Sequence, residues 1–274
     1  MKPGKFDYCL PDSVDETLAL LAEFGDDARI IAGGQSLMAM MNLRLVAAEV
    51  LIDIAGLKEL DFIREAGGAV EVGAAVAQVD LLNHPGLDTV QPLLAKAMPN
   101  IGHFQTRNRG TVCGSIAHQD PSSELPLCLA ALEGEVVLRS TKGERRLTAS
   151  EFQVGLMETA RAPDELIVAV RFPVARNGVG YAFTEVTRRP GDFAIVGLAG
   201  IADGNNLRLG VAGVGGKPAP PAMDTHKDNL DKALNAFAWE LGGEDDIHAT
   251  AKHRRHMVRQ LGRQVLEEAM SCAS

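Results

Sequence analysis

The stretch of sequence that decides the fold reads Ile30-Ile31-Ala32-Gly33-Gly34-Gln35-Ser36-Leu37-Met38. An apolar run of strand length stops there at two glycines, and a helical pattern begins directly after them. Glycine carries no Cβ, so the backbone N–H groups of such a turn can approach a ligand closely. A helix that begins there adds free N–H donors and the positive end of its dipole, and Gln35 and Ser36 add uncharged side-chain donors. The stretch therefore indicates one half of a phosphate-binding site.

A second loop of the same character lies further along the chain, at Gly110-Thr111-Val112-Cys113-Gly114-Ser115. It is again built from small and hydroxyl-bearing residues, and Ile116-Ala117-His118-Gln119-Asp120-Pro121 follows it. Either loop alone is compatible with an ordinary glycine-rich turn. Two such loops supply uncharged donors for two phosphates without a lysine, so together they indicate a diphosphate site.

The composition is that of a globular protein with an excess of acidic groups. The 274 residues are 46% hydrophobic and 23% charged, with a formal net charge of −9, and a chain of this length can bury a sizeable core. Nucleic acids and anionic membranes select clustered Lys and Arg, so neither is the expected partner. No apolar run reaches membrane-spanning length and Met1–Tyr8 has no signal-peptide character, so no membrane insertion is expected.

The four cysteines are widely spaced and form no CxxC motif: Cys9, Cys113, Cys128 and Cys272. This spacing predicts neither a disulfide framework nor a metal or iron–sulfur site within the chain. Free thiols are typical of a reducing compartment, and we expect the protein in the cytoplasm.

The first part of the chain, residues 1–56, is predicted to be a small β–α–β unit. Ser13 followed by Glu16 is a capping-box pattern that begins a helix ending near Gly25. The remaining elements expected here are a strand at Arg29–Ala32, a helix at Gln35–Leu45 and a strand at Val50–Ile54.

Residues 57–174 are predicted to form a larger α+β unit. Glycine-containing turns mark two hairpins, and helical patterns and one more strand lie between and after them. The expected hairpins are Leu60–Glu65 with Ala69–Gly73 and Glu135–Arg139 with Glu144–Leu147. The expected helices are Gln78–Leu82, Leu87–Met98, which Pro92 interrupts near its start, and one from Ser122 or Ser123 to Leu132, and a strand is expected at Glu165–Phe172.

Residues 175–274 are predicted to form a C-terminal antiparallel sheet with helices. Three strands form a meander, a proline-rich crossing follows, and two helices end the chain. The expected ranges are strands at Tyr181–Arg188, Phe193–Ala202 and Leu207–Val214, the crossing at Lys217–Pro221, and helices at Lys227–Leu241 and Asp246–Ala269. The fold class expected for the whole chain is α+β.

Three ordered motifs resemble the FAD-binding medium subunits of molybdenum hydroxylases, the family of the carbon monoxide dehydrogenase medium chain and the flavin domain of xanthine dehydrogenase. The first motif is Ala32–Leu37 with Arg44-Leu45 closing its helix, and the second runs from Arg107 through Pro126. The third is Arg188–Ala194, and Asp246–His256 is similar to the family's last helix. Three motifs in the same order are far more specific than any one of them.

The resemblance implies a two-part FAD-binding domain followed by the C-terminal sheet. It implies that the two glycine loops hold the FAD pyrophosphate, that Glu124 lies near the ribityl hydroxyls and that Phe193 lies beside the isoalloxazine ring. Larger side chains at Gly33 or Gly114 would then displace the pyrophosphate. The candidate cofactor-binding residues are Ala32, Gly33, Gly34, Gln35, Ser36, Leu37, Thr111, Val112, Cys113, Gly114, Ser115, His118, Asp120, Glu124, Leu166 and Phe193. No catalytic residue and no metal ligand is assigned to this chain.

Two positions depart from the family pattern. Relatives commonly carry Gly-Gly where this chain has Cys113-Gly114, and often carry a lysine near the flavin where this chain has Glu185. Cys113 is either a thiol near the cofactor or a small residue packed under the loop.

Several polar residues beside the second loop have more than one interpretation. His103 and His118 could act as acid–base groups or hydrogen-bond the loop backbone. Asp120 could brace the loop or bond the flavin. Arg107 and Arg109 could approach phosphate, brace the loop or face a partner.

The resemblance implies an electron-transfer role in a multi-subunit, heterotrimeric oxidoreductase. A molybdenum-pterin centre in a large subunit would oxidise the substrate, and [2Fe-2S] clusters of a small iron–sulfur subunit would pass electrons to FAD in this chain and on to an external acceptor. The expected assembly is a dimer of heterotrimers. The alternatives are a free-standing FAD-dependent oxidase or dehydrogenase of the vanillyl-alcohol-oxidase type, and a diphosphate-binding assembly module without flavin function.

Overall fold

The structure is a computed structural model that describes residues 2–215 and 223–273. The proline-rich crossing expected at Lys217–Pro221 lies outside the described residues. Sheets of three, five and four strands follow one another along the chain, and a two-stranded ribbon accompanies the middle sheet. The fold is α+β, as predicted from the sequence.

The N-terminal unit is a parallel three-stranded sheet in the order β1-β3-β2. Its elements are β1 (Asp7–Cys9), α1 (Val14–Phe24), a short 3-10 helix (Gly25–Asp27), β2 (Ala28–Ile31), α2 (Leu37–Asn42) and β3 (Val50–Asp53). The Ser13 hydroxyl caps α1 by accepting from the Glu16 N–H, but the Glu16 carboxylate accepts from the Asp12 N–H instead of returning to Ser13. The predicted capping box is therefore only half formed.

The α2 helix is shorter than the predicted helix at Gln35–Leu45. Gln35 and Ser36 form a turn before it, and the chain leaves the helix at Leu43. Arg44 has a φ of 60°, in the left-handed region, so the helical pattern ends there. The sequence also gave no sign of β1, which is too short for periodicity to reveal.

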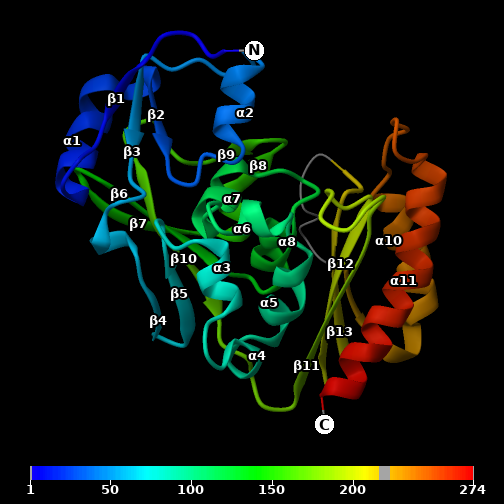
Figure 1. Cartoon of the computed structure of the whole chain (residues 1–274). Coiled ribbons are helices and arrows are strands. Elements are labelled where there is room, and N and C mark those ends of the chain that lie inside the picture. The colour runs from blue at the N-terminus through cyan, green and yellow to red at the C-terminus, as the bar shows by residue number, and fades with distance from the viewer. Residues whose placement is uncertain (1, 216–222, 274) are drawn as a thin grey trace.

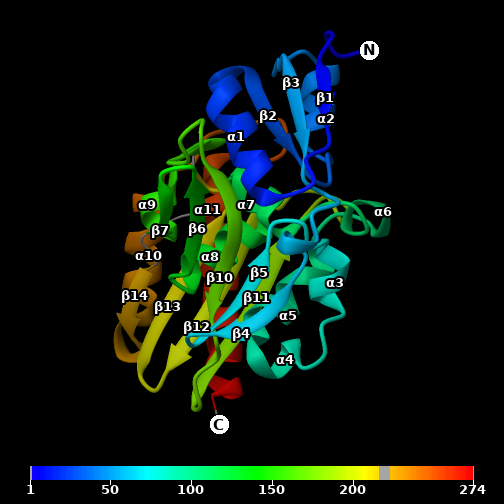
Figure 2. The same cartoon turned by 90° about the vertical axis from the view of Figure 1, so that its left-hand side faces the viewer.

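The middle sheet has the antiparallel order β4-β5-β10-β6-β7 (Figure 2). Both predicted hairpins are confirmed, and β10 joins them by lying between β5 and β6. The strands are β4 (Ile63–Ala66), β5 (Ala69–Gly73), β6 (Glu135–Ser140), β7 (Gly143–Thr148) and β10 (Leu166–Pro173), and the separate ribbon is β8 (Gln153–Gly155) with β9 (Glu158–Thr159).

Short helices connect the strands of the middle part. They are 3-10 turns at Lys58–Leu60 and Met98–Asn100, and α3 (Gln78–Leu82), α4 (Leu87–Val90), α5 (Pro92–Ala97), α6 (Phe104–Arg107), α7 (Val112–His118), α8 (Glu124–Ala131) and α9 (Ala149–Phe152). The helix predicted at Leu87–Met98, with an interruption by Pro92 near its start, is divided in two at Gln91, and Pro92 is the first residue of α5. The Gln91 side chain accepts from the Leu93 N–H and donates to the Pro173 carbonyl, so it caps α5 and ties it to the end of β10.

The C-terminal sheet is an antiparallel meander in the order β11-β12-β13-β14. Its elements are β11 (Val179–Val186), β12 (Val196–Asp203), β13 (Asn206–Ala212), β14 (Met223–His226), a 3-10 turn (Lys227–Asn229), α10 (Leu230–Glu240) and α11 (Ala251–Cys272). Several predicted boundaries differ by two or more residues; among them, β12 begins at Val196 rather than Phe193, and α11 begins at Ala251 rather than Asp246. The Thr250 side chain caps α11, because its hydroxyl accepts from the His253 N–H. The fourth strand, β14, was not predicted.

The layers explain how distant segments meet. α5 and α8 lie between the middle and C-terminal sheets, while α10 and α11 cover the outer face of the C-terminal sheet (Figure 1). A β-carbon on Gly180 of β11 would lie 1.8 Å from the Ala269 carbonyl oxygen of α11, so glycine lets this helix approach the strand backbone. On the opposite face of the sheet, α5 contacts β11 and α8 contacts β12 and β13.

Candidate functional site

The structure brings the two glycine loops into direct contact. A β-carbon built on Gly33 would stand 2.0 Å from the Arg109 carbonyl oxygen and 2.7 Å from the Gly110 α-carbon. The side chain of Gln35 also reaches the second loop, where its Cγ would lie 3.5 Å from a β-carbon on Gly110. The two glycine loops are therefore in contact with each other in the fold.

Strand ends and a short helix hold the loops in place. β2 ends at Ile31, whose carbonyl accepts from the Ile54 N–H, and the first loop leaves the sheet there. The second loop is fixed to the segment around α3: the Gly110 carbonyl accepts from the Gln78 N–H at 2.8 Å, and the Val112 N–H donates to the Val76 carbonyl.

The first loop presents a row of free backbone donors. Across residues 2–215 and 223–273, the N–H groups of Gly33 through Leu37 have no protein acceptor. Gly34 has a φ of 68°, which turns the backbone between the strand and α2. Such a row of N–H groups fits an anion without help from a cationic side chain.

The second loop begins α7. The Thr111 hydroxyl caps this helix by accepting from the Gly114 N–H at 3.0 Å, and within the described residues the Cys113 N–H has no acceptor. A β-carbon on Gly114 would stand 2.7 Å from that hydroxyl oxygen. The reason predicted for needing glycine is therefore incomplete: at both Gly33 and Gly114 the space beside the α-carbon is filled by the protein itself.

Cys113 is a packed residue and no reactive thiolate. Its side chain is buried, its S–H donates to the Val72 carbonyl, and burial raises the pKa of the thiol far above its usual value. His118, the last residue of α7, is half-buried, and burial lowers the pKa of its imidazole. A neutral imidazole fits hydrogen bonding better than a charge role.

Asp120 and Arg107 both brace loops. The Asp120 carboxylate accepts from the Ser122 N–H at 2.8 Å, which closes a turn before α8. The Arg107 guanidinium donates to the carbonyls of Ile101 and Gly102 at 2.7 and 3.0 Å. These bonds favour the bracing interpretation for both residues, while Arg109 is exposed.

Gln119 was missed by the sequence reasoning. It is fully buried with a φ of 53°, and neither its amide oxygen nor its amide nitrogen has a partner among the described residues. Its backbone carbonyl accepts from the Met157 N–H of the β8–β9 ribbon. Buried amides without partners are rare in proteins, and no pattern in the sequence distinguishes this glutamine from an exposed one.

Glu124, the first residue of α8, is 5% exposed. Burial raises the pKa of its carboxyl to about 7. Glu185 on β11 has its pKa raised to about 8, first by burial and then by the charge of Glu124. The structure therefore places Glu124, a predicted site residue, near Glu185, where this sequence departs from the family pattern.

Phe193 projects from the loop between β11 and β12, with 57% of its surface exposed. The loop is held at its base by the Ile195 N–H, which donates to the Val186 carbonyl at 2.8 Å. It also packs against the segment before the second glycine loop, because a β-carbon on Gly191 would lie 2.6 Å from the His103 ring. Phe193 therefore lies on a loop that contacts His103, in the segment that leads to the second glycine loop.

Leu166, the remaining candidate, begins β10 beside Arg139 of β6 and is buried in the core of the middle part. Its burial is explained by core packing. The structure gives no further reason to place it at the site.

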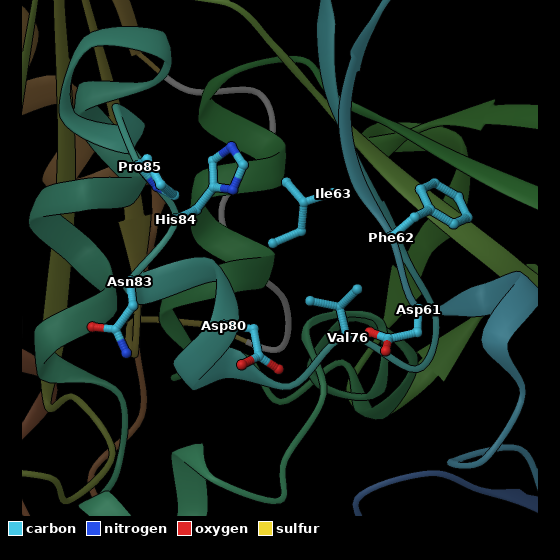
Figure 3. A pocket seen from close by; sticks show the side chains of 8 residues that line it. All are labelled: Asp61, Phe62, Ile63, Val76, Asp80, Asn83, His84 and Pro85. Atoms are coloured by element: carbon cyan, nitrogen blue, oxygen red, sulfur yellow. The ribbon is translucent and has the colours of Figure 1, made fainter.

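A hollow of about 430 Å³ lies between the start of β4 and α3 (Figure 3). Figure 3 shows the side chains of Asp61 and Phe62 on the side of β4 and those of Asn83, His84 and Pro85 on the side of α3. A second hollow of about 420 Å³ lies between the end of α8 and the C-terminal sheet. None of the sixteen candidate residues lines either hollow.

Two searches bear on other kinds of site. Among the described residues, no group of three or more His, Cys, Asp or Glu side chains is arranged to hold a metal ion. In that same part of the chain, no helix combines the length and the apolar character needed to cross a membrane.

Comparison with known proteins covers nearly the whole chain. Residues 4–175 match the family described as the FAD binding domain in molybdopterin dehydrogenase. The carbon monoxide dehydrogenase medium chain of Hydrogenophaga pseudoflava is 34% identical over 100% of both chains. The 6-hydroxypseudooxynicotine dehydrogenase complex subunit alpha of Paenarthrobacter nicotinovorans is 36% identical over 98% of this chain and 96% of that one.

Solved structures of similar proteins have the same fold over the whole chain. A carbon monoxide dehydrogenase from Hydrogenophaga pseudoflava, described as lacking the Mo-pyranopterin moiety of the molybdenum cofactor, superposes with a TM-score of 0.92 at 33% identity over 100% of both chains. A chain of quinoline 2-oxidoreductase from Pseudomonas putida 86 has a TM-score of 0.90 at 29% identity, over 100% of this chain and 99% of that one.

Proposed function

Because the chain belongs to the family of FAD-binding domains of molybdopterin dehydrogenases, we propose that it is the electron-transfer subunit of a molybdenum hydroxylase. Membership makes it an FAD-binding subunit of an oxidoreductase. The proposed step beyond membership is the route of the electrons: into the FAD of this chain from a partner's [2Fe-2S] clusters, and out to an external acceptor.

The residues of the two loops fit the cofactor. The free N–H groups of Gly33–Leu37 are suited to one phosphate, and the start of α7 is suited to the other. We assign Glu124 to the ribityl hydroxyls, because a buried acid is a natural partner for sugar hydroxyls, and Phe193 to the isoalloxazine ring. FAD would supply one- and two-electron chemistry, while the protein holds it and controls access to it.

The row of free N–H groups at the contact between the two loops is the observation that carries this assignment. A cradle of uncharged donors suits a diphosphate held beside an electron-transfer centre, since it adds no net charge there. The contact of Gly33 with Arg109 keeps both halves in a fixed relation.

Partners are needed for the substrate reaction. No metal-binding cluster lies within residues 2–215 and 223–273, so we assign substrate oxidation to a large subunit with a molybdenum-pterin centre and the clusters to a small iron–sulfur subunit. Relatives are named as medium chains or as subunits of complexes. We propose a dimer of heterotrimers.

We also propose three structural parts: residues 1–56 and 57–174 as the two halves of the FAD-binding region, and 175–274 as a C-terminal domain. The family match ends at residue 175. A separate buried cluster beneath α10 and α11 supports the last boundary.

The first experiment is purification with any co-expressed partner subunits, followed by visible spectroscopy and acid release of the flavin. We expect a yellow protein that releases FAD, and partner chains rich in cysteine. Mixing the complex with its substrate without added acceptor should bleach the flavin absorbance. A colourless chain that fails to take up FAD would contradict the assignment, and flavin reduction by substrate in the isolated chain would favour a free-standing oxidase.

A further inference from the structure

Two carboxyl groups, those of Glu124 and Glu185, lie close enough for the charge of Glu124 to act on Glu185. The register places them together: Glu185 is opposite Gly197 of β12, and a β-carbon on Gly197 would contact Leu127 of α8, one turn after Glu124. Within the described residues, neither carboxyl forms an ion pair, and the Glu185 Oε2 is buried without a hydrogen-bond partner.

The groups around this pair provide no compensating cation. Asp120, in the turn before α8, raises the pKa of Glu124 further by its negative charge. His118 lies next to Asp120, and burial lowers its pKa, which favours the neutral ring. From α5, which packs against β11, the one basic side chain is Lys96, and it pairs with Glu268 of α11.

The basic residues of α11 are on the other side of the sheet. Successive side chains of a strand point to opposite faces, and Phe183 belongs to the core shared with α5 and α8 while Ala182 belongs to the core beneath α11. Glu185 is two residues after Phe183 on the same strand, so its side chain points to the same face, towards α8. The titratable groups on α11 are Lys252, His253, Arg254, Arg255, His256, Arg259, Arg263, Glu267, Glu268 and Cys272.

The two carboxyls are not equivalent. Glu124 is at the N-terminus of α8 and its carboxylate accepts from its own backbone N–H, which stabilises the ionised form. Glu185 is within a β-strand, where its neighbours offer no such donor to the buried oxygen. A carboxylic acid at Glu185 can instead donate its own proton.

We propose that Glu124 and Glu185 share one proton at neutral pH, that Glu185 is the protonated member, and that this uncharged carboxyl faces the flavin as a hydrogen-bond donor. The last clause rests on the proposed function; the shared proton does not. Glu185 is one residue from the end of β11, where the loop carrying Phe193 begins, and Glu124 is itself a candidate cofactor residue.

The shared proton makes folding depend on pH with a defined sign. Both carboxyls have pKa values raised above the usual 4.5, to about 7 and about 8. Between about pH 4.5 and about pH 8, the folded chain therefore binds more protons than the unfolded chain. The contribution of the two carboxyls to the free energy of unfolding is full below about pH 4.5 and falls as the pH rises to about 8.

The first test is infrared spectroscopy of the flavin-free full chain as a function of pH. We expect a protonated-carboxyl C=O band at neutral pH in the wild type, which disappears as the pH rises past about 8. Glu185→Gln should remove the part of the band that persists to about pH 8, and Glu124→Gln should make the band disappear at a lower pH, because burial still favours the protonated Glu185 but the second charge is gone. Glu165→Gln is the matched control: Glu165 is 8% exposed but bonded to Arg145, so its removal should leave the band unchanged.

The second test is the dissociation constant of FAD between about pH 6 and about pH 9. Wild type should bind roughly tenfold more weakly at the upper end, while Glu185→Gln, which keeps an uncharged donor, should stay nearly constant. A chain without a protonated-carboxyl band at neutral pH would overturn the shared proton. A band together with no FAD binding would leave the pair standing and refute the proposed function, and equal pH profiles for both proteins would overturn the donor role.

Discussion

Gly33 and Arg109 are in van der Waals contact through their backbones: the carbonyl oxygen of Arg109 occupies the space where a β-carbon of residue 33 would lie. The first glycine loop is therefore shaped by the second, and a side chain at position 33 would separate them. This relationship makes the glycine a test of the site as a whole.

Gly33→Ala is expected to weaken FAD binding and to destabilise the fold. Because the clash is with backbone that cannot rotate away, we expect a loss of about 1–3 kcal/mol in the free energy of unfolding. Urea unfolding and FAD titration measure the two effects. Gly56→Ala is the matched control, since a β-carbon there meets nothing within 4 Å and the backbone φ is ordinary; equal behaviour of both variants would contradict the contact.

Thr111→Val should lower both the stability of the fold and its affinity for FAD. Loss of the hydroxyl that accepts from the Gly114 N–H should cost about 1 kcal/mol of stability and also weaken FAD binding, because the start of α7 loosens. Thr250→Val removes the equivalent cap of α11. It should cost a similar amount of stability and leave the FAD dissociation constant unchanged.

Phe193→Ala should alter how the flavin reacts more than how it binds. With 57% of its surface exposed, Phe193 contributes little to folding, and we expect a change in stability within about 0.5 kcal/mol. The reoxidation rate of reduced flavin and its midpoint potential should change. Trp239→Ala, at 61% exposure on α10, is the control and should change neither; if Phe193→Ala behaves the same way, Phe193 is not beside the ring.

Arg254→Met should strongly destabilise the C-terminal sheet and loosen the Phe193 loop. The buried Arg254 guanidinium donates to the Ile195 carbonyl at 2.7 Å and pairs with the Asp246 carboxylate, so its loss should cost about 3–5 kcal/mol. The neighbouring Arg255→Met, which loses a stacking contact on Trp239, should cost far less. Thermal unfolding of both variants measures this difference, and equal losses of stability would contradict the structural role of Arg254.

The same pair predicts an acid response. N–H bonds from Ala249 and His248, with Arg254 beside it, lower the pKa of Asp246 to about 2. Its stabilising contribution is present above the unfolded value of 3.8 and is lost as the pH falls towards 2. Asp246→Asn should therefore flatten the acid-unfolding curve in that range.

Local patterns predicted most of the secondary structure because each depends on a few adjacent residues. The turns at Gly67-Gly68 and around Lys142 lie between strand-forming runs, and both hairpins are confirmed. The break before α5 has a local signal in Pro92, whereas the bond from Gln91 to Pro173, far along the chain, has none. The predicted helix ends at Leu45 and Asp246 were wrong for a different reason: the left-handed backbone of Arg44 ends α2, and the Thr250 cap begins α11.

The two glycine loops could be recognised in the sequence, but their contact with each other could not. Their glycines and hydroxyls are visible in the sequence, whereas the contact of Gly33 with Arg109 depends on how two sheets pack. The burial of Gln119 and the approach of Glu185 to Glu124 also arise from tertiary packing. These are the features that extend the candidate site beyond the motifs.

The position of β10 has a consequence for how the chain folds. It is the central strand of the middle sheet, yet it is the last of the five to leave the ribosome, after both hairpins have been made. Until residue 173 emerges, the two hairpins have no common partner, so closure of this sheet depends on contacts distant in sequence, which are slow to form. We therefore expect the nascent chain to acquire its flavin-binding shape late, in a single cooperative step that follows completion of β10.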